Sequence, residues 1–129
     1  MADLPKLSKY MHKALKIGSS ETEVTIERMQ AFLQTIKENQ IKGFASDEFG
    51  GAIWHATLGP NDLLYTPPVY AVGAQVHKQN VYGLSLCMII KSQDIADRYT
   101  WLAENMGKDE QKAKVAKGLA DFIAASGSE

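Results

Sequence analysis

The hydrophobic pattern of the chain changes twice, and this change constrains the fold more than any other feature. Apolar residues recur at helical spacing in residues 5–40 and 93–125, whereas residues 52–90 approach a period of two. We therefore expect an α+β fold, in which a small antiparallel β-sheet of about four strands is flanked by two N-terminal and two C-terminal helices. With 129 residues and a 45% hydrophobic content, the chain is expected to form one domain over residues 1–129.

Two helices are expected before the sheet. The first spans residues 5–17, with Pro5 in its first turn and Gly18 as its stop. The second spans residues 20–40, where Ser20 and Glu23 match the spacing of a capping box. Its apolar face is expected to consist of Ile26, Met29, Phe32, Leu33 and Ile36.

A row of lysines follows the first helix on the side opposite its apolar stripe. The row consists of Lys6, Lys9, Lys13 and Lys16. It fits either an anionic partner or an ordinary solvated helix face, and the pattern favours the solvated face.

Residues 41–51 are expected to form a loop, because they contain three glycines and an acidic pair, Asp47 and Glu48. Adjacent carboxylates rarely converge on one substrate atom, so a solvated turn is favoured over an acid–base or metal site.

Four strands are expected, over residues 52–58, 63–66, 69–77 and 81–90, the last two joined as a hairpin. In the last strand, large side chains share one face: Tyr82, Leu84, Leu86, Met88 and Ile90. The side chains on the opposite face are mostly small. We therefore expect this strand to be covered on both faces, by a helix or a ligand, and expect Cys87 to be buried and inert.

Two helices are expected after the sheet. Ser92 or Asp94 can cap the first, whose stripe consists of Ile95, Tyr99, Leu102 and Met106 and whose stop is Gly107. Asp109 can cap the second. The very short link between them makes these two helices neighbours.

The segment GPNDLLYTPPVYAV resembles a strand–turn–strand of the cupin and JmjC-like β-barrel family. The matching residues are Pro60, Asp62, Leu63, Leu64, Tyr65, Pro67 and Pro68, and YGLSLCMII resembles the next barrel strand. The resemblance is weak and local, over residues 52–90. Asn61 replaces the turn glycine of the family, and Val72 stands where its metal-binding histidine is expected. The resemblance therefore implies a metal-free, cupin-like meander.

Residues with catalytic potential do not form a recognisable set. His55 and His77 lack a nearby carboxylate in the sequence, and no Gly-x-Ser-x-Gly elbow or phosphate-binding loop is present. We therefore expect no catalytic residues, no metal site and no cofactor, and the sequence favours a protein that is not an enzyme.

Aromatic and histidine side chains of the sheet region are the candidate ligand-binding residues: Trp54, His55, Tyr65, Tyr70, His77 and Tyr82. Such side chains suit binding surfaces and cores alike. Three hypotheses remain open: a non-enzymatic binding or assembly domain for a small molecule or protein, a diverged cupin-like metal-dependent enzyme that uses His55, Asp62 and His77, and a homo-oligomeric structural protein. For the oligomer we expect a homodimer joined at residues 52–58, with Trp54 at its centre.

Composition excludes several classes of partner. A net charge of −1 with 22% charged residues does not favour nucleic acid. No apolar run reaches the roughly 18–20 residues of a membrane span. Lysines interrupt the apolar core that a secretory signal would need, and a single cysteine fits a reducing compartment. We expect a soluble, cytoplasmic protein.

Overall fold

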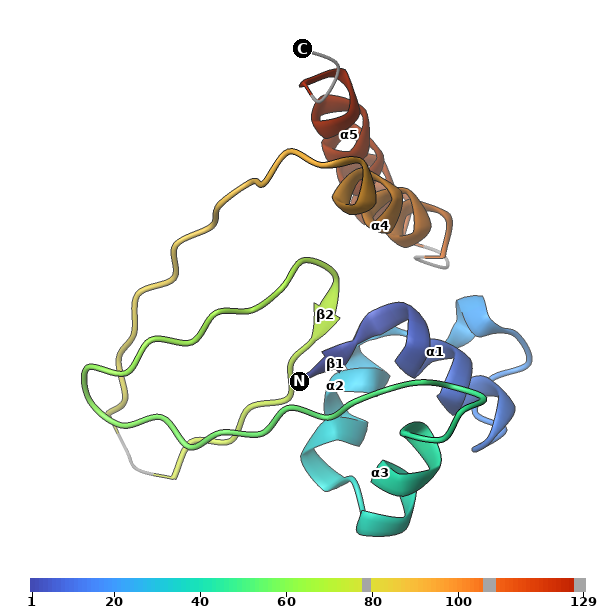
Figure 1. Ribbon diagram of the computed structural model, residues 1–129, viewed down its shortest axis with the longest axis vertical. Helices are drawn as coiled ribbons and strands as arrows, with labels where there is room; N and C mark the ends of the chain where they lie inside the picture. The colour runs from blue at the N-terminus through green and yellow to red at the C-terminus, as the bar shows by residue number, and fades with distance from the viewer. Residues whose placement is uncertain (78–79, 106–108, 127–129) are drawn as a thin grey trace. The chain divides into compact units, whose positions relative to one another are not determined.

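The computed structural model describes residues 1–77, 80–105 and 109–126. The chain divides into two compact units, Met1–Gly73 (unit 1) and Ala74–Glu129 (unit 2) (Figure 1). The single domain expected over residues 1–129 stays a prediction.

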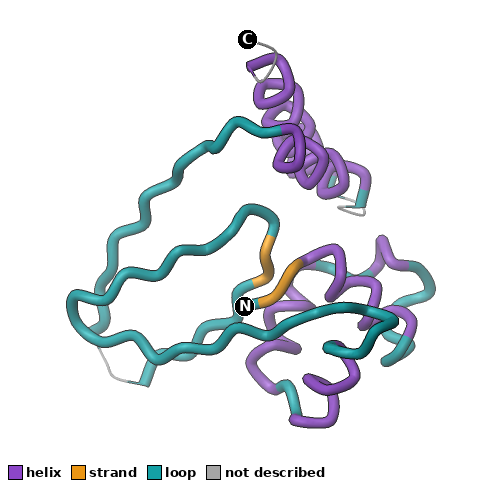
Figure 2. Tube along the Cα trace, in the orientation of Figure 1, coloured by secondary structure: helices purple, strands orange, loops and turns teal. Residues whose placement is uncertain are grey.

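Helices provide nearly all of the regular structure. Unit 1 contains β1 (Ala2–Asp3), α1 (Leu4–Lys13), the short 3₁₀ helix η1 (Glu21–Glu23), α2 (Ile26–Thr35), α3 (Glu38–Phe44) and β2 (Tyr70–Ala71). Unit 2 contains α4 (Gln93–Glu104) and α5 (Glu110–Ser126). A long connection without helix or strand joins α3 to β2 in unit 1, and in unit 2 the described residues before α4 are also without helix or strand (Figure 2).

Helix α1 carries much of the core of unit 1. The Asp3 carboxylate accepts a hydrogen bond from the Lys6 N–H at 3.1 Å and caps the helix, and proline occupies its first turn. The helix buries Leu4, Leu7, Ser8, Tyr10 and Met11. The predicted first helix is thus confirmed, although it ends at Lys13 rather than at residue 17.

The predicted single helix over residues 20–40 is wrong, because the chain forms three shorter helices there. Ser20 makes no side-chain cap, and Thr25 caps α2 instead by accepting from the Arg28 N–H at 3.2 Å. Ile36 then adopts an extended conformation and separates α2 from α3. Helix α3 continues to Phe44, so the first part of the predicted loop over residues 41–51 is helical.

Tyr10 is the centre of an aromatic cluster in unit 1. Its ring lies 6.4 Å from the ring of Phe32, 5.5 Å from that of Phe44 and 5.1 Å from that of Phe49, measured between centroids. The break in the second predicted helix allows α2 and α3 to present separate rings to Tyr10. Burial raises the pKa of the Tyr10 hydroxyl.

The predicted four-stranded sheet is wrong. The described residues form one antiparallel sheet of two strands, in which Ala2 pairs with Ala71 and Asp3 with Tyr70. The predicted strands over residues 52–58, 63–66 and 81–90 have no regular strand pairing, and the predicted strand 69–77 is reduced to β2. Alternating side chains favour extended backbone, but a strand also needs a partner, and the partner here is an N-terminal segment too short to show a pattern.

Unit 2 contains a helical hairpin, in which α4 and α5 lie side by side (Figure 1). Ser92 caps α4 by accepting from the Ile95 N–H at 3.3 Å, and Asp109 caps α5 by accepting from the Lys112 N–H at 3.0 Å. Both predicted helices are confirmed, while Met106 and Gly107 lie outside the described residues. The buried residues are mostly small, namely Ala96, Ala116, Ala120 and Ile123. In the part of the chain that the structure describes, no helix has the length and apolar character needed to cross a membrane.

Candidate interaction surface

A tight turn organises the extended part of unit 1. The Asp62 N–H donates to the Gly59 carbonyl at 3.2 Å, and the Asp62 carboxylate accepts from the Gly59 N–H at 2.7 Å. Pro60 occupies the second position, and Asn61 has a φ of +68°, as the third position of a type II turn requires. Residues 59–62, between the predicted strands 52–58 and 63–66, therefore form a type II turn, and the Asp62 carboxylate stabilises it.

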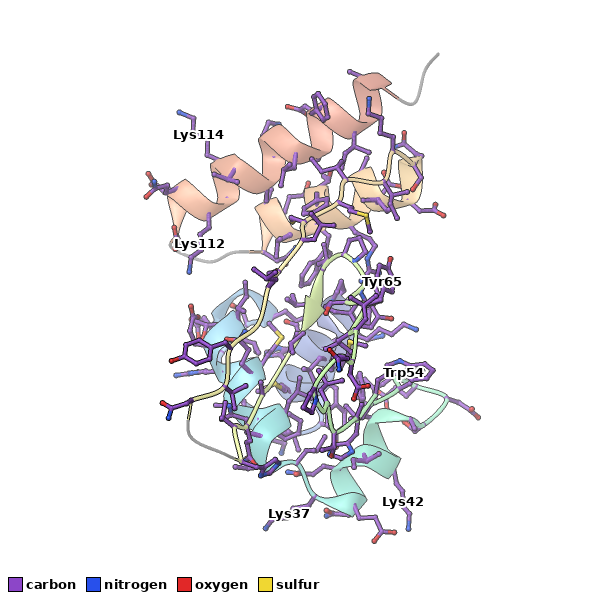
Figure 3. The ribbon with its side chains drawn as sticks, turned by 90° about the vertical axis from the view of Figure 1, so that its left-hand side faces the viewer. Lys37, Lys42, Trp54, Tyr65, Lys112 and Lys114 are labelled. Atoms are coloured by element: carbon purple, nitrogen blue, oxygen red, sulfur yellow. The ribbon has the colours of Figure 1, made fainter. Side chains whose placement is uncertain are left out.

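The segments on either side of this turn expose large apolar side chains. Trp54 and Tyr65 project from the extended chain of unit 1 (Figure 3), with exposed fractions of 60% and 56%. Apart from Trp54 and the turn itself, residues 52–66 make no hydrogen bond to other described residues. The extended form of this region is therefore not held by a neighbouring strand.

Trp54 is the exception because it pairs with the first residue of the chain. Its N–H donates to the Met1 carbonyl at 2.9 Å, and its carbonyl accepts from the Met1 amino group. Burial lowers the pKa of that amino group. One main-chain edge at Trp54 is therefore occupied within unit 1.

Residues 81–90 form the most exposed apolar segment, which we call the apolar arm. It runs in extended form towards α4 (Figure 1), and its side chains are exposed along its whole length. Tyr82 is 90% exposed, and Leu84 is fully exposed. Residues 81–90 make no hydrogen bond to any other described residue. Among the described residues, no main-chain group therefore pairs with either edge of the arm.

The expected covering of the arm on both faces is not found among the described residues of unit 2. Cys87 is exposed, so the prediction that its thiol is buried is wrong. The prediction assumed that a strand with a large and a small face lies inside a sheet, whereas the structure leaves this strand without a sheet.

A second apolar surface of unit 2 lies on the helical hairpin. An open groove of about 450 Å³ runs between α4 and α5 and is lined mostly by apolar side chains: Tyr99, Leu102, Val115, Ala116 and Leu119, with Gln111 and Lys112. Lys112 lies near the start of α5, and its ammonium group is 3.3 Å from the Asp109 carboxylate (Figure 3). The sequence places Tyr99 and Leu102 on an expected apolar helix stripe but does not reveal the groove, which requires the relative position of two helices.

The six candidate ligand-binding residues belong to different units. Unit 1 contains Trp54, His55, Tyr65 and Tyr70, and unit 2 contains His77 and Tyr82. In unit 1, the N-terminal segment links two of them, because Met1 pairs with Trp54 and Asp3 pairs with Tyr70. All six are exposed except Tyr70, which is partly buried. Their role in ligand binding stays a prediction.

Potential catalytic groups are scattered. Among residues 1–77, 80–105 and 109–126, no group of three or more His, Cys, Asp or Glu side chains is placed to hold a metal ion. His12 on α1 has a buried Nδ1 atom without a hydrogen-bond partner among the described residues. The sequence alone does not mark this histidine as distinct, because it stands among the lysines of the first predicted helix.

Comparisons with known proteins leave the class of the chain open. No protein-family model, no curated protein and no solved structure matches it. The resemblance of residues 52–90 to the cupin and JmjC-like family therefore stays a hypothesis that no match supports.

Proposed function

We propose that this protein is a non-enzymatic assembly domain that works as a homo-oligomer. One observation carries the proposal. Of the sixteen large apolar side chains that are exposed in the described residues, thirteen lie between Trp54 and Ile90. The protein therefore concentrates its exposed apolar surface in one stretch of sequence.

The physical reason for assembly is the free energy that is gained when this exposed apolar surface is removed from water. Soluble monomers rarely leave large contiguous apolar patches in water, and burying one large apolar side chain contributes about 1.5–3 kcal/mol. Extended segments also leave main-chain donors and acceptors open, and these favour pairing with another chain. Contact with another polypeptide would satisfy both requirements at once.

The main-chain hydrogen bonds of each segment help to decide which segment we propose as the contact between copies. The sequence pointed to residues 52–58 with Trp54 at the centre, but Trp54 already pairs with Met1 on one edge. The apolar arm has no such pairing with any residue that the structure describes. We therefore place the principal contact at the arm and not at Trp54.

Sedimentation velocity over a wide concentration range tests this proposal. We expect the native protein to self-associate as its concentration rises, and expect the double substitution Leu84→Lys/Leu86→Lys to abolish this association. Leu63→Lys is the matched control, because Leu63 is as exposed as the arm residues but lies in unit 1. A native protein that stays monomeric at every concentration would contradict the proposal.

A further inference from the structure

The composition of the apolar arm narrows the kind of partner it fits. Residues 81–90 carry no charged side chain, so they offer no charge complementarity to an acidic or basic surface. Their two main-chain edges, which pair with no described residue, instead suit another extended strand. A second copy of this chain supplies an apolar strand of matching length.

We infer that the arm pairs antiparallel with the arm of a second copy, about a two-fold axis at Leu86. This inference rests on the proposed function, because it names the contact through which the oligomer forms. Directly opposite residues of an antiparallel pair lie on the same face, so the large face of one arm must meet the large face of the other. An axis at Leu86 places Tyr82 opposite Ile90, Leu84 opposite Met88, and Leu86 opposite its own copy.

Neighbouring registers match the two arms less well. An axis at Ser85 sets Ile90 opposite the polar Asn80, and an axis at Cys87 sets Tyr82 opposite Ser92. A shift by one residue between the strands would place large side chains opposite small ones. Only the axis at Leu86 keeps all five large side chains of each arm in apolar pairs.

A two-stranded ribbon is marginal in water unless one of its faces is covered. The groove between α4 and α5 offers an apolar surface in the same unit, and the arm runs into α4 directly at its cap, Ser92. The Lys91 ammonium group lies 5.3 Å from the centre of the Phe122 ring, which holds the end of the arm beside α5. Each arm of the ribbon therefore leads into a helical hairpin that carries an apolar groove.

The register can be tested by disulfide cross-linking, because the only native cysteine of the chain lies in the arm. With the axis at Leu86, Cys87 of one copy lies opposite Ser85 of the other. A Ser85→Cys variant therefore brings two thiols within disulfide distance across the ribbon. Treated with oxidised glutathione, it should form covalent dimers on non-reducing gels roughly tenfold more than the native protein.

Matched variants separate this register from the others. Gly83→Cys should cross-link weakly, because position 83 faces Ile89 when the axis is at Leu86. Ser85→Cys/Cys87→Ser should lose the cross-link, because the thiol at position 85 then faces a hydroxyl group. All variants are tested at a concentration at which sedimentation detects association of the native protein.

Each result decides the inference. Strong cross-linking of Ser85→Cys alone supports it. Strong cross-linking of the native protein would overturn it, because it indicates an axis at Cys87 or parallel strands. Strong cross-linking of Gly83→Cys would overturn it, because it indicates an axis at Ser85. Strong cross-linking of Ser85→Cys/Cys87→Ser would also overturn it, because it indicates an axis at Ser85 or parallel strands. Self-association without any cross-link would overturn the register and leave the proposed function standing, whereas the absence of self-association would overturn both.

Discussion

Val69 combines a buried β-branched side chain with a left-handed backbone. Its φ is +58°, a region that β-branched residues rarely adopt, and it lies between Pro68 and the start of β2. Its carbonyl accepts a hydrogen bond from the Leu4 N–H at 3.1 Å, which joins the entry of β2 to the start of α1. The hydrogen bond from the start of α1 thus anchors a residue in an unfavourable conformation.

This strain predicts an unusual response to glycine at position 69. Val69→Gly loses a buried side chain but relieves the left-handed backbone, whereas Val24→Gly loses a similar side chain at an ordinary φ of −79°. We expect Val24→Gly to lower the free energy of unfolding by about 1–2 kcal/mol more than Val69→Gly. Urea unfolding of both variants measures this difference. Equal losses would show that Val69 is not strained in solution.

Asp109 predicts a local response to pH. Its hydrogen bond from the Lys112 N–H lowers the pKa of the carboxyl group, so the charged form stabilises the start of α5. A lowered pKa in the folded state means that this stabilisation is present above the ordinary pKa of the group. It is lost as the pH falls through the lowered value.

An acid titration followed by NMR checks this response. The Lys112 amide resonance should shift in the native protein below about pH 4, the ordinary range of an aspartate. It should stay nearly constant in Asp109→Asn, which keeps an acceptor oxygen but does not titrate. An identical shift in both proteins would contradict the assigned cap.

At the scale of single elements, the loop after α3 is set by close packing on Phe44. The Gly51 N–H donates to the Phe44 carbonyl at 2.9 Å, and a Cβ atom at position 51 would overlap the buried Phe44 ring. We therefore expect Gly51→Ala to destabilise unit 1 by about 1–3 kcal/mol. Gly118→Ala is the control, because a Cβ there meets open space on α5 and should stabilise the helix by about 1 kcal/mol. Thermal unfolding of both variants gives the comparison, and a neutral Gly51→Ala would argue against this packing.

The groove between α4 and α5 predicts a separate effect on assembly. Val115 lines the groove and is 61% exposed, so Val115→Lys should leave the hairpin folded. We expect this variant to weaken self-association about tenfold, because it places a charge where the ribbon would pack. Ala124→Lys adds the same charge to an exposed position of α5 outside the groove and should have little effect. Sedimentation of both variants measures the change, and equal behaviour would exclude the groove from the contact.

The elements that the sequence predicts well are those fixed by neighbouring residues. The caps at Ser92 and Asp109 act within three positions, so both C-terminal helices follow from the local pattern. The turn at residues 59–62 is local in the same way. Strand pairing depends on partners far along the chain, and no local pattern relates Met1 to Trp54. The same distinction applies to the candidate interaction surface. The sequence shows that the arm is apolar, but it does not show that the arm is exposed.

For the whole molecule, the apolar arm is the feature that most needs an explanation. The compact parts of both units are helical, and nearly all of their buried residues come from the five α-helices and the two short strands, with Val24 and Val69 just outside these elements. The arm contributes to neither core. Its alternating large and small side chains are those of a covered strand, and we propose that a second copy covers it.

Amide hydrogen exchange of residues 81–90 tests this claim most directly. At a protein concentration that favours the oligomer, these amides should exchange slowly, because strand pairing occupies them, and they should exchange rapidly when the protein is diluted. In Leu84→Lys/Leu86→Lys they should exchange rapidly at both concentrations, while the amides of α1 stay protected. Rapid exchange of the arm in the native protein at every concentration, with α1 protected, would contradict the account.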